Sequence, residues 1–344
     1  MGTLAAPLLA RTASAQRGTE PAYVSYTGSS GLGSGRRVVL ISGDEEYRSE
    51  EALPQIGKIL SRHHGFQCTV HFAIDPASGG INPDVSDNIP GLETLRDADL
   101  MIIATRFRHL PDQQMREIDD YVHSGRPMLG MRTATHAFQF PEDSPSSYKH
   151  YSWNNKDAWP GGFGKQVLGE TWISHHGHHA VQSTRGIAAP GAKEHPILRG
   201  CEDIWGPTDV YTAKPPADSA LLVMGEVLTG MKATDGPVKG DYVVERNGRR
   251  IVSRPNDPMM PVAWTRTFTG RSKKPSRVFT TTMGAATDLE NEGMRRLIVN
   301  AAFWSLGMEA DIPQRTFVGL VGDYRPTPFG FGKYRRGLRL KDFA

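Results

Sequence analysis

The 344-residue sequence has only two cysteines, Cys68 and Cys201, so it could form one disulfide at most. A disulfide-built scaffold and a CxxC metal or redox motif are therefore excluded. No stretch approaches the ~18 consecutive apolar residues of a membrane helix. The formal net charge is only +3 and no basic run is interleaved with aromatics, so nucleic acid is not an expected partner. The 38% of hydrophobic residues suffices for one large α/β domain or two small ones.

The first residues indicate export. Residues 1–15 contain a short apolar core followed by Ala-Ser-Ala at 13–15, the A-x-A pattern of signal-peptide cleavage. The basic start of such a peptide is missing, so we expect a truncated signal peptide on a periplasmic or secreted protein; a disordered tail is the alternative. Residues 16–35 are rich in Gly and Ser and predict a flexible linker. The GLGSG stretch precedes the first expected strand instead of following it, so no nucleotide cofactor is expected.

From residue 36 on, short apolar runs alternate with amphipathic segments. The runs RVVLISG, CTVHFAI, ADLMIIAT, RPMLGMRT and RVFTTTMG predict buried parallel strands. Helical spacing of apolar residues, as in Leu53, Ile56 and Leu60, predicts helices between them. This alternation predicts an α/β domain over 36–310, with a doubly wound, mostly parallel sheet and helices on both faces. Residues 140–275 are expected to form long insertions with a few extra strands, and 311–344 an extension packed on the domain.

Polar stretches follow four of the predicted strands, where ligands bind in open parallel sheets. For any single residue there, a loop ion pair or a cap is the commoner role, but together the stretches predict one crevice. The substrate-binding residues that we expect from these stretches and from the insertions are Asp44, Glu45, Glu46, Tyr47, Arg106, His109, Thr133, Trp172, Asp209 and Asp288.

Arg132 stands where the fourth strand is expected to break into a helix. Class I glutamine amidotransferases place their cysteine nucleophile at this point, in a pattern like G-x-C-x-G. An arginine cannot lose its proton in a protein, so it is neither nucleophile nor base. It can bind or polarise oxygen-rich groups, helped by the adjacent helix N-terminus. Amidotransferase and cysteine-protease activities are therefore excluded, and no G-x-S-x-G supports a serine hydrolase.

Several motifs resemble the ThuA-like (trehalose-utilisation) family. They are VVLISGDEEYRSEEALP, GMRTATHAF, VLGETWISHHGHH, HPILRGCEDIWGPTDVY and the segment from VAWTR to SLGME, in family order over residues 36–310. The PFGFG tail is similar to a branch found in exported bacterial proteins. The resemblance implies a flavodoxin-like fold related to class I amidotransferases, and a link to catabolism of disaccharides and their keto-sugar forms. Many relatives carry Gly-His where this chain has Gly284-Ala285, so that role is absent here or has moved to Asp288.

Histidine occupies four of the five positions of 175–179. An extended backbone, which we favour, would place His176 and His178 on one face, as half of a zinc, manganese or iron site. A helical turn would instead pair His175 with His179. Proton transfer without a metal and a solvent-exposed run are the alternatives to a metal site. The remaining ligands would come from His136, Asp209 or Asp288.

Two functions compete. The first is an enzyme, a lyase, isomerase or hydrolase, that acts on a small carbohydrate through an enolate-type intermediate. His136, His176 or His178 would be its base or ligand, and Arg132 or a metal would stabilise the enolate oxygen. The alternative is a non-catalytic carbohydrate-binding or accessory protein; a structural partner in a surface assembly is a third interpretation. The sequence does not fix the oligomeric state, so a homo-oligomer stays open. The aromatic faces that could stack on sugars are Trp153, Trp159, Trp172 and Trp205.

Overall fold

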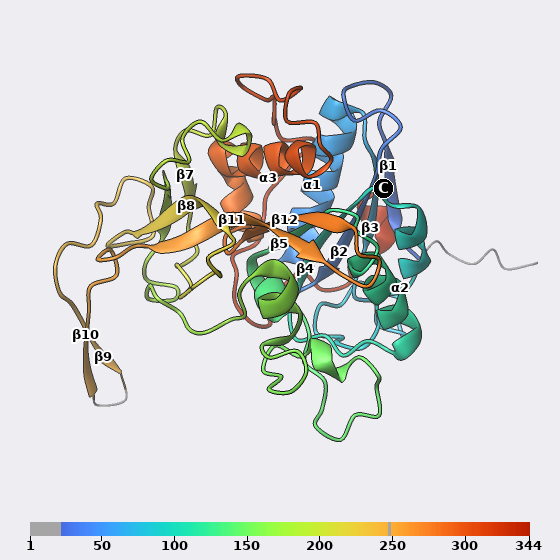
Figure 1. Ribbon diagram of the computed structural model, residues 1–344, viewed down its shortest axis with the longest axis horizontal. Helices are drawn as coiled ribbons and strands as arrows, with labels where there is room; N and C mark the ends of the chain where they lie inside the picture. Colours follow the sequence, from blue (N-terminus) through green and yellow to red (C-terminus); the bar gives the residue numbers. More distant parts are fainter. Residues whose placement is uncertain (1–21, 247–248) are drawn as a thin grey trace, which may run out of the picture.

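A computed structural model of the chain describes residues 22–246 and 249–344, and the signal peptide expected at 1–15 lies outside the described residues. The described residues form a ten-stranded sheet in the order β1-β3-β2-β4-β5-β12-β11-β8-β6-β7 (Figure 1). None of the helices in these ranges is long and apolar enough to cross a membrane.

The centre of the sheet consists of parallel strands. These are β2 (Arg37–Gly43), β3 (Gln67–His71), β4 (Leu100–Thr105), β5 (Met128–Met131) and β12 (Pro275–Thr281). Their spatial order, β3-β2-β4-β5-β12, is the second, first, third, fourth and fifth in the chain, which is the flavodoxin order. The predicted flavodoxin-like α/β fold is confirmed.

Antiparallel strands extend this centre on both sides. On one side follow β11 (Met260–Thr269), β8 (Ala220–Val227), β6 (Thr184–Ala188) and β7 (Ile204–Gly206), which are the extra strands expected in the middle of the chain. On the other side β1 (Val24–Thr27) pairs with β3, so part of the segment predicted as a linker belongs to the sheet. The hairpin of β9 (Tyr242–Arg246) and β10 (Arg249–Ser253) is separate.

Helices cover both faces of the parallel centre. In β2, Val38 and Leu40 face the hydrophobic core that contains α1 (Ser49–His64) and α3 (Glu292–Ser305), whereas Val39 and Ile41 face the core of α2 (Asp112–Val122). Successive side chains of a strand point to opposite faces, so a continuous apolar run is what a strand covered on both sides requires. Figure 1 shows α1 and α3 next to each other over one face.

The C-terminal segment 311–344 lies against α1 and the loop before it. The backbone N–H of Thr327 donates to Glu51 Oε2 at 2.7 Å, and the guanidinium of Arg48 donates to the carbonyl oxygen of Gly330. The hydroxyl of Tyr334 donates to Asp84 Oδ2 at 2.7 Å. These contacts bring the end of the chain to the carboxyl edge of the parallel strands, where β2 ends.

Candidate functional site

Strained backbone marks the carboxyl edge of the parallel strands. Arg48, Phe107 and Arg132, which follow β2, β4 and β5, have φ angles of 62°, 51° and 44°. L-residues rarely adopt this left-handed region, and such residues cluster at active sites and ligand-binding loops. Three of them on neighbouring loops make this edge the candidate functional region of the fold.

Arg132 opens the short 3₁₀ helix Arg132–His136 directly after β5, at the break from strand to helix (the elbow) that the sequence predicts. Its guanidinium is buried and donates to the carbonyl oxygens of Asp209 and Thr282 at 2.9 and 2.6 Å. It lies between the rings of Tyr47 and Tyr211, at 4.3 and 3.9 Å from their centroids. All of these contacts are with the protein itself, so the geometry favours a positioning role for Arg132 over the predicted contact with substrate oxygens.

Asp209 is the centre of the polar network. Its fully buried carboxylate contacts Arg132 Nη2 at 3.1 Å through Oδ1. The same carboxylate meets His175 Nδ1 at 2.7 Å through Oδ2 and His179 Nδ1 at 3.1 Å through Oδ1. Burial would raise the pKa of Asp209, but the hydrogen bonds of both histidines and the charge of Arg132 outweigh it and hold the pKa well below its usual range. The carboxylate is therefore ionised at neutral pH.

His175 and His179 face the same carboxylate, and their ring centroids are 4.7 Å apart. About a third of each side chain is exposed, 32% and 31%, so both imidazoles can be reached from solvent. Within the described ranges His175 Nε2 has no hydrogen-bond partner, whereas His179 Nε2 lies 3.4 Å from Glu46 Oε1. These two histidines are the accessible, positioned imidazoles of the site.

The other two histidines of this stretch point elsewhere. His176 Nε2 contacts the carbonyl oxygen of Pro255 at 2.8 Å, and the ring of His178 lies 5.8 Å from that of Tyr242. The reason is local: the carbonyl of Val210 binds the N–H groups of residues 176 and 177, and the chain then turns at His178. The pairing of His176 with His178 expected from an extended backbone is therefore not seen. His175 and His179 come together instead, through a bend and not through the helical turn considered as the alternative.

Asp44 connects the loop after β2 to the elbow. Its Oδ1 accepts from the N–H groups of Glu46 and Tyr47 at 2.8 and 3.1 Å, and its Oδ2 accepts from Thr133 Oγ1 at 2.7 Å. The buried carboxylate thus shapes the loop, and Thr133 fixes it to the elbow. Asp44 and Thr133, both predicted to bind substrate, are hydrogen-bonded to each other.

Glu45 and Glu46 are paired with arginines that follow β4. Arg106 and Arg108 both contact Glu45, and Arg106 Nε lies 3.4 Å from Glu46 Oε2. Burial raises the pKa of Glu46, an effect that Arg106 and His179 only partly offset. Glu46 therefore holds a proton at higher pH than an exposed glutamate does, which suits proton transfer.

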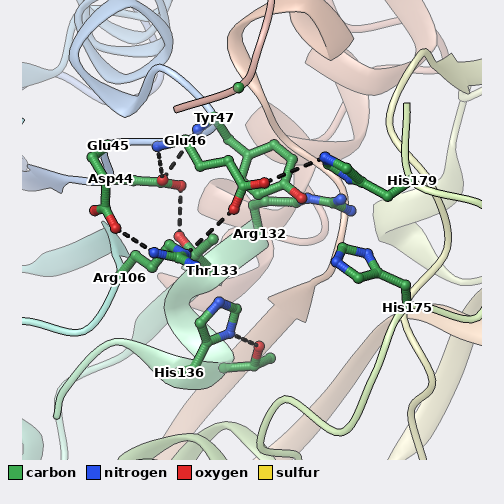
Figure 2. A network of polar contacts seen from close by, with 12 residues as sticks. Asp44, Glu45, Glu46, Tyr47, Arg106, Arg132, Thr133, His136, His175 and His179 are labelled. Carbon is green, nitrogen blue, oxygen red and sulfur yellow. Dashed lines mark hydrogen bonds and ion pairs between the residues drawn. The ribbon is translucent and has the colours of Figure 1, made fainter. Parts of the chain in front are cut away.

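His136 lies opposite Glu46 and the two histidines that Asp209 holds. Its ring packs 5.8 Å from Trp172 and 6.1 Å from Tyr211, and Nδ1 is 3.2 Å from Thr135 Oγ1. Burial, together with Arg106 and Arg132, holds the pKa of His136 well below its usual range, so the imidazole is neutral. Figure 2 shows His136, His175, His179 and the Glu46 carboxylate turned toward one region.

Two of the predicted residues lie outside this group. Asp288 Oδ2 accepts from the N–H groups of residues 284 and 285 at 2.8 and 3.1 Å and from Thr208 Oγ1 at 2.8 Å, so the buried carboxylate closes the loop after β12. His109 lines a separate cavity of about 500 Å³ with Pro111 and Phe140. Neither position is open to a ligand held by His175 and Glu46.

Two of the four tryptophans proposed to stack on sugars lie near the candidate site, and two lie elsewhere. Trp172 packs 5.8 Å from His175, and Trp153 packs 5.8 Å from Trp172. Trp159 contacts aromatic residues in the core under α2, and Trp205 Nε1 donates to Ser183 Oγ in the antiparallel extension. Of the four, Trp172 contacts His175, and Trp153 lies next to Trp172.

Four site residues were not predicted from the sequence: Arg108, Tyr211, Phe329 and Phe331. Arg108 stands two positions after Arg106 and Tyr211 two positions after Asp209, and this spacing is the signal that could have identified both. The ring of Phe329 packs against Tyr47 and His179, at 5.6 and 5.4 Å. No local pattern indicates that a segment so late in the chain reaches this edge.

Comparisons with known proteins agree with the sequence motifs. The chain matches the family model ThuA, described as trehalose utilisation, over residues 37–305. Similar solved structures include a ThuA-like protein from Parabacteroides merdae ATCC 43184, with 13% identity, 79% of this chain and 90% of that chain covered, and a TM-score of 0.45. Another is a ThuA-like protein from Bacteroides uniformis ATCC 8492, with 14% identity, 81% and 95% covered, and a TM-score of 0.40. No curated protein matches significantly.

Proposed function

Because the chain belongs to the ThuA (trehalose-utilisation) family, we propose that it is an enzyme acting on disaccharides or their keto-sugar derivatives through an enolate-type intermediate. One observation carries the proposal: two accessible imidazoles, His175 and His179, are held by the buried, ionised carboxylate of Asp209. A carboxylate that fixes the Nδ1 of a histidine orients the imidazole and stabilises the imidazolium that forms when Nε2 takes a proton.

The proposed reaction begins with removal of the proton next to a ring carbonyl. A carbonyl acidifies the neighbouring C–H, and His175 Nε2 is the base, since its Nδ1 is held by Asp209 at 2.7 Å. The neutral imidazole of His136 donates to the oxygen on which negative charge develops, as a preorganised hydrogen bond. Isomerisation follows when the neighbouring hydroxyl passes its proton to the enolate oxygen and the abstracted proton returns to the former carbonyl carbon. Elimination follows when the enolate re-forms the carbonyl and the glycosidic C–O bond breaks, with Glu46 donating a proton to the leaving glycosidic oxygen.

Deuterium exchange tests this proposal directly. The wild-type protein is incubated in D₂O with trehalose that carries one ring carbonyl, and ¹H NMR follows the C–H beside that carbonyl. We expect its signal to disappear, or a product to form, at a rate proportional to protein concentration. A substrate that stays unchanged after prolonged incubation, with added zinc, manganese and iron, would contradict an enzymatic role. Binding without exchange would support a carbohydrate-binding protein instead.

The same three residues support a second candidate, a metal-assisted form of this reaction. One ligand atom each from His175, His179 and Asp209 lies within 4.8 Å of the others. Two imidazole nitrogens and a carboxylate are a donor set that suits zinc, manganese or iron, and Glu46 beside His179 Nε2 is placed like the carboxylates that orient metal-bound histidines. A metal there would supply Lewis acidity at the substrate oxygen. His175 would then be a ligand, and Glu46 the base.

Metal content distinguishes the two forms. The protein is purified without a His-tag or a nickel column and measured by mass spectrometry. The metal-assisted form predicts about one zinc, manganese or iron per chain, lost in the His175→Ala/His179→Ala double variant and kept in the His176→Ala/His178→Ala control. Metal-free protein that takes up no ion on titration would leave His175 as the base and exclude the metal-assisted form.

A further inference from the structure

Within the C-terminal segment 311–344, residues 327–334 contribute to the candidate site although they lie beyond residues 37–305, which the family model matches. Phe329 packs with its ring against Tyr47 and His179, as described above. The next aromatic residue, Phe331, is 60% exposed, and its ring centroid lies 4.9 Å from the guanidinium carbon of Arg106. A part of the chain outside the matched region thus forms one wall of the site.

Hydrogen bonds hold Phe331 in place from both sides. Before it, the N–H of Gly330 donates to the carbonyl oxygen of Glu46 at 2.8 Å, and the carbonyl of Gly330 accepts from Arg48. After it, the hydroxyl of Tyr334 is bound by Asp84. The φ of 123° at Gly330 requires glycine there. The exposed ring is therefore carried by a fixed backbone and is preorganised to receive a ligand.

Exposure alone would mean little, because single apolar side chains are common on protein surfaces. The surroundings of Phe331 are what distinguish it. Arg106 is sandwiched between Phe331 and Phe107, at 4.9 and 4.4 Å from the two ring centroids, and pairs with Glu45 and Glu46. An aromatic face thus lies next to carboxylates and a guanidinium, which are strong hydrogen-bonding partners for hydroxyl groups.

Phe317 provides the comparison within the same segment. It is 66% exposed, but its ring packs 4.7 Å from His63, at the end of α1 that lies away from the carboxyl edge of the strands. Among the described residues this ring, unlike that of Phe331, contacts no guanidinium that is paired to carboxylates. Phe317 is therefore a matched control for Phe331.

Building on the proposed function, we propose that Phe331 is a substrate-binding residue that stacks on the second, non-reacting pyranose ring of a disaccharide. The C–H face of a pyranose is apolar and its rim carries hydroxyls, which matches an aromatic face bordered by Glu45, Glu46 and Arg106. The reacting ring would lie at His175 and His136. Glu46, which contacts both His179 and Arg106, marks the boundary between the two rings. Phe331 thereby selects disaccharides over monosaccharides.

Binding to the full-length protein tests this assignment. Trehalose and glucose are titrated and followed by saturation-transfer NMR for the wild type, Phe331→Ala, Phe331→Trp and Phe317→Ala. We expect Phe331→Ala to weaken trehalose binding about tenfold, the size of effect common when an aromatic anchor is truncated. Glucose binding should stay unchanged, Phe331→Trp should retain trehalose binding, and Phe317→Ala should behave as the wild type.

Unchanged trehalose affinity in Phe331→Ala overturns the role of Phe331, and if the wild type still catalyses deuterium exchange, the proposed function survives. Equal losses for trehalose and glucose overturn the assignment to the second ring, because that ring is absent from glucose. A wild type that binds neither sugar and exchanges no proton overturns both the inference and the proposed function. An equal loss in Phe317→Ala would show a general effect of the C-terminal segment and also overturn the inference.

Discussion

Replacing His175 by alanine is expected to lower turnover of the keto-disaccharide by about 10²–10⁴-fold, the contribution typical of a positioned general base. A loss of similar order is expected for His179→Ala, because both imidazoles are held by Asp209 and His179 also orders Glu46. The same change at His176 or His178 should leave turnover nearly unchanged, since these rings contact Pro255 and Tyr242 instead. Rates of deuterium exchange measured by NMR give the comparison.

These four variants control for one another. Each removes the same group from one five-residue stretch, and thermal unfolding shows whether each variant is folded. Equal losses in all four would mean that the stretch acts only through its structure. A loss confined to His176→Ala and His178→Ala would restore the pairing expected of an extended backbone and contradict the pairing seen here.

The centre of the fold could be predicted because its signals are local. RVVLISG is apolar at successive positions, which only a strand covered on both faces requires, and it forms β2 with the predicted ends. The strand β11 is different. Most residues in its first half are buried, whereas burial alternates in its second half. Its place between β12 and β8 depends on pairing with β8, which lies more than thirty residues earlier in the chain. The antiparallel extension could thus be expected only as extra strands of unspecified position.

The sequence predicts the edge of the sheet at which the candidate site lies, but not which side chains meet there. The rule that ligands bind at the carboxyl ends of parallel strands identifies the loops after β2, β4 and β5. Within a loop, side-chain direction depends on single dihedral angles. The positive φ of Phe107 precedes the buried Arg108, which turns to Glu45, while His109 lines another cavity. Such an angle has no signature in one sequence.

The surroundings of Arg132 depend on contacts between segments that are distant in the sequence. Whether Arg132 reaches a substrate depends on Tyr47, Tyr211 and the carbonyl of Thr282, which come from three distant segments. The sequence shows that an arginine replaces a nucleophile at the elbow, and that conclusion stands. What it does not show is that these segments enclose the guanidinium.

Replacing Arg132 by methionine is therefore expected to reduce stability strongly. Removing one partner of a buried ion pair typically lowers the free energy of unfolding by about 3–5 kcal/mol, because the other charge stays buried without its partner. Here Asp209 would keep only its two histidines, and the carbonyl oxygens of Asp209 and Thr282 would lose their donor. Denaturant unfolding measures the change. Arg62→Met, on the exposed side of α1, is the control, with an expected change within about 0.5 kcal/mol.

The double variant Arg132→Met/Asp209→Leu separates a positioning role from substrate contact. If the destabilisation comes from the unpaired carboxylate, removing Asp209 as well should recover part of the lost stability, since apolar replacements of whole buried pairs are often neutral. Turnover should not recover, because His175 has lost the carboxylate that orients it. An Arg132→Met variant as stable as Arg62→Met that nevertheless loses turnover would contradict this view. It would show that the guanidinium acts on the substrate, as its place at the elbow first suggested.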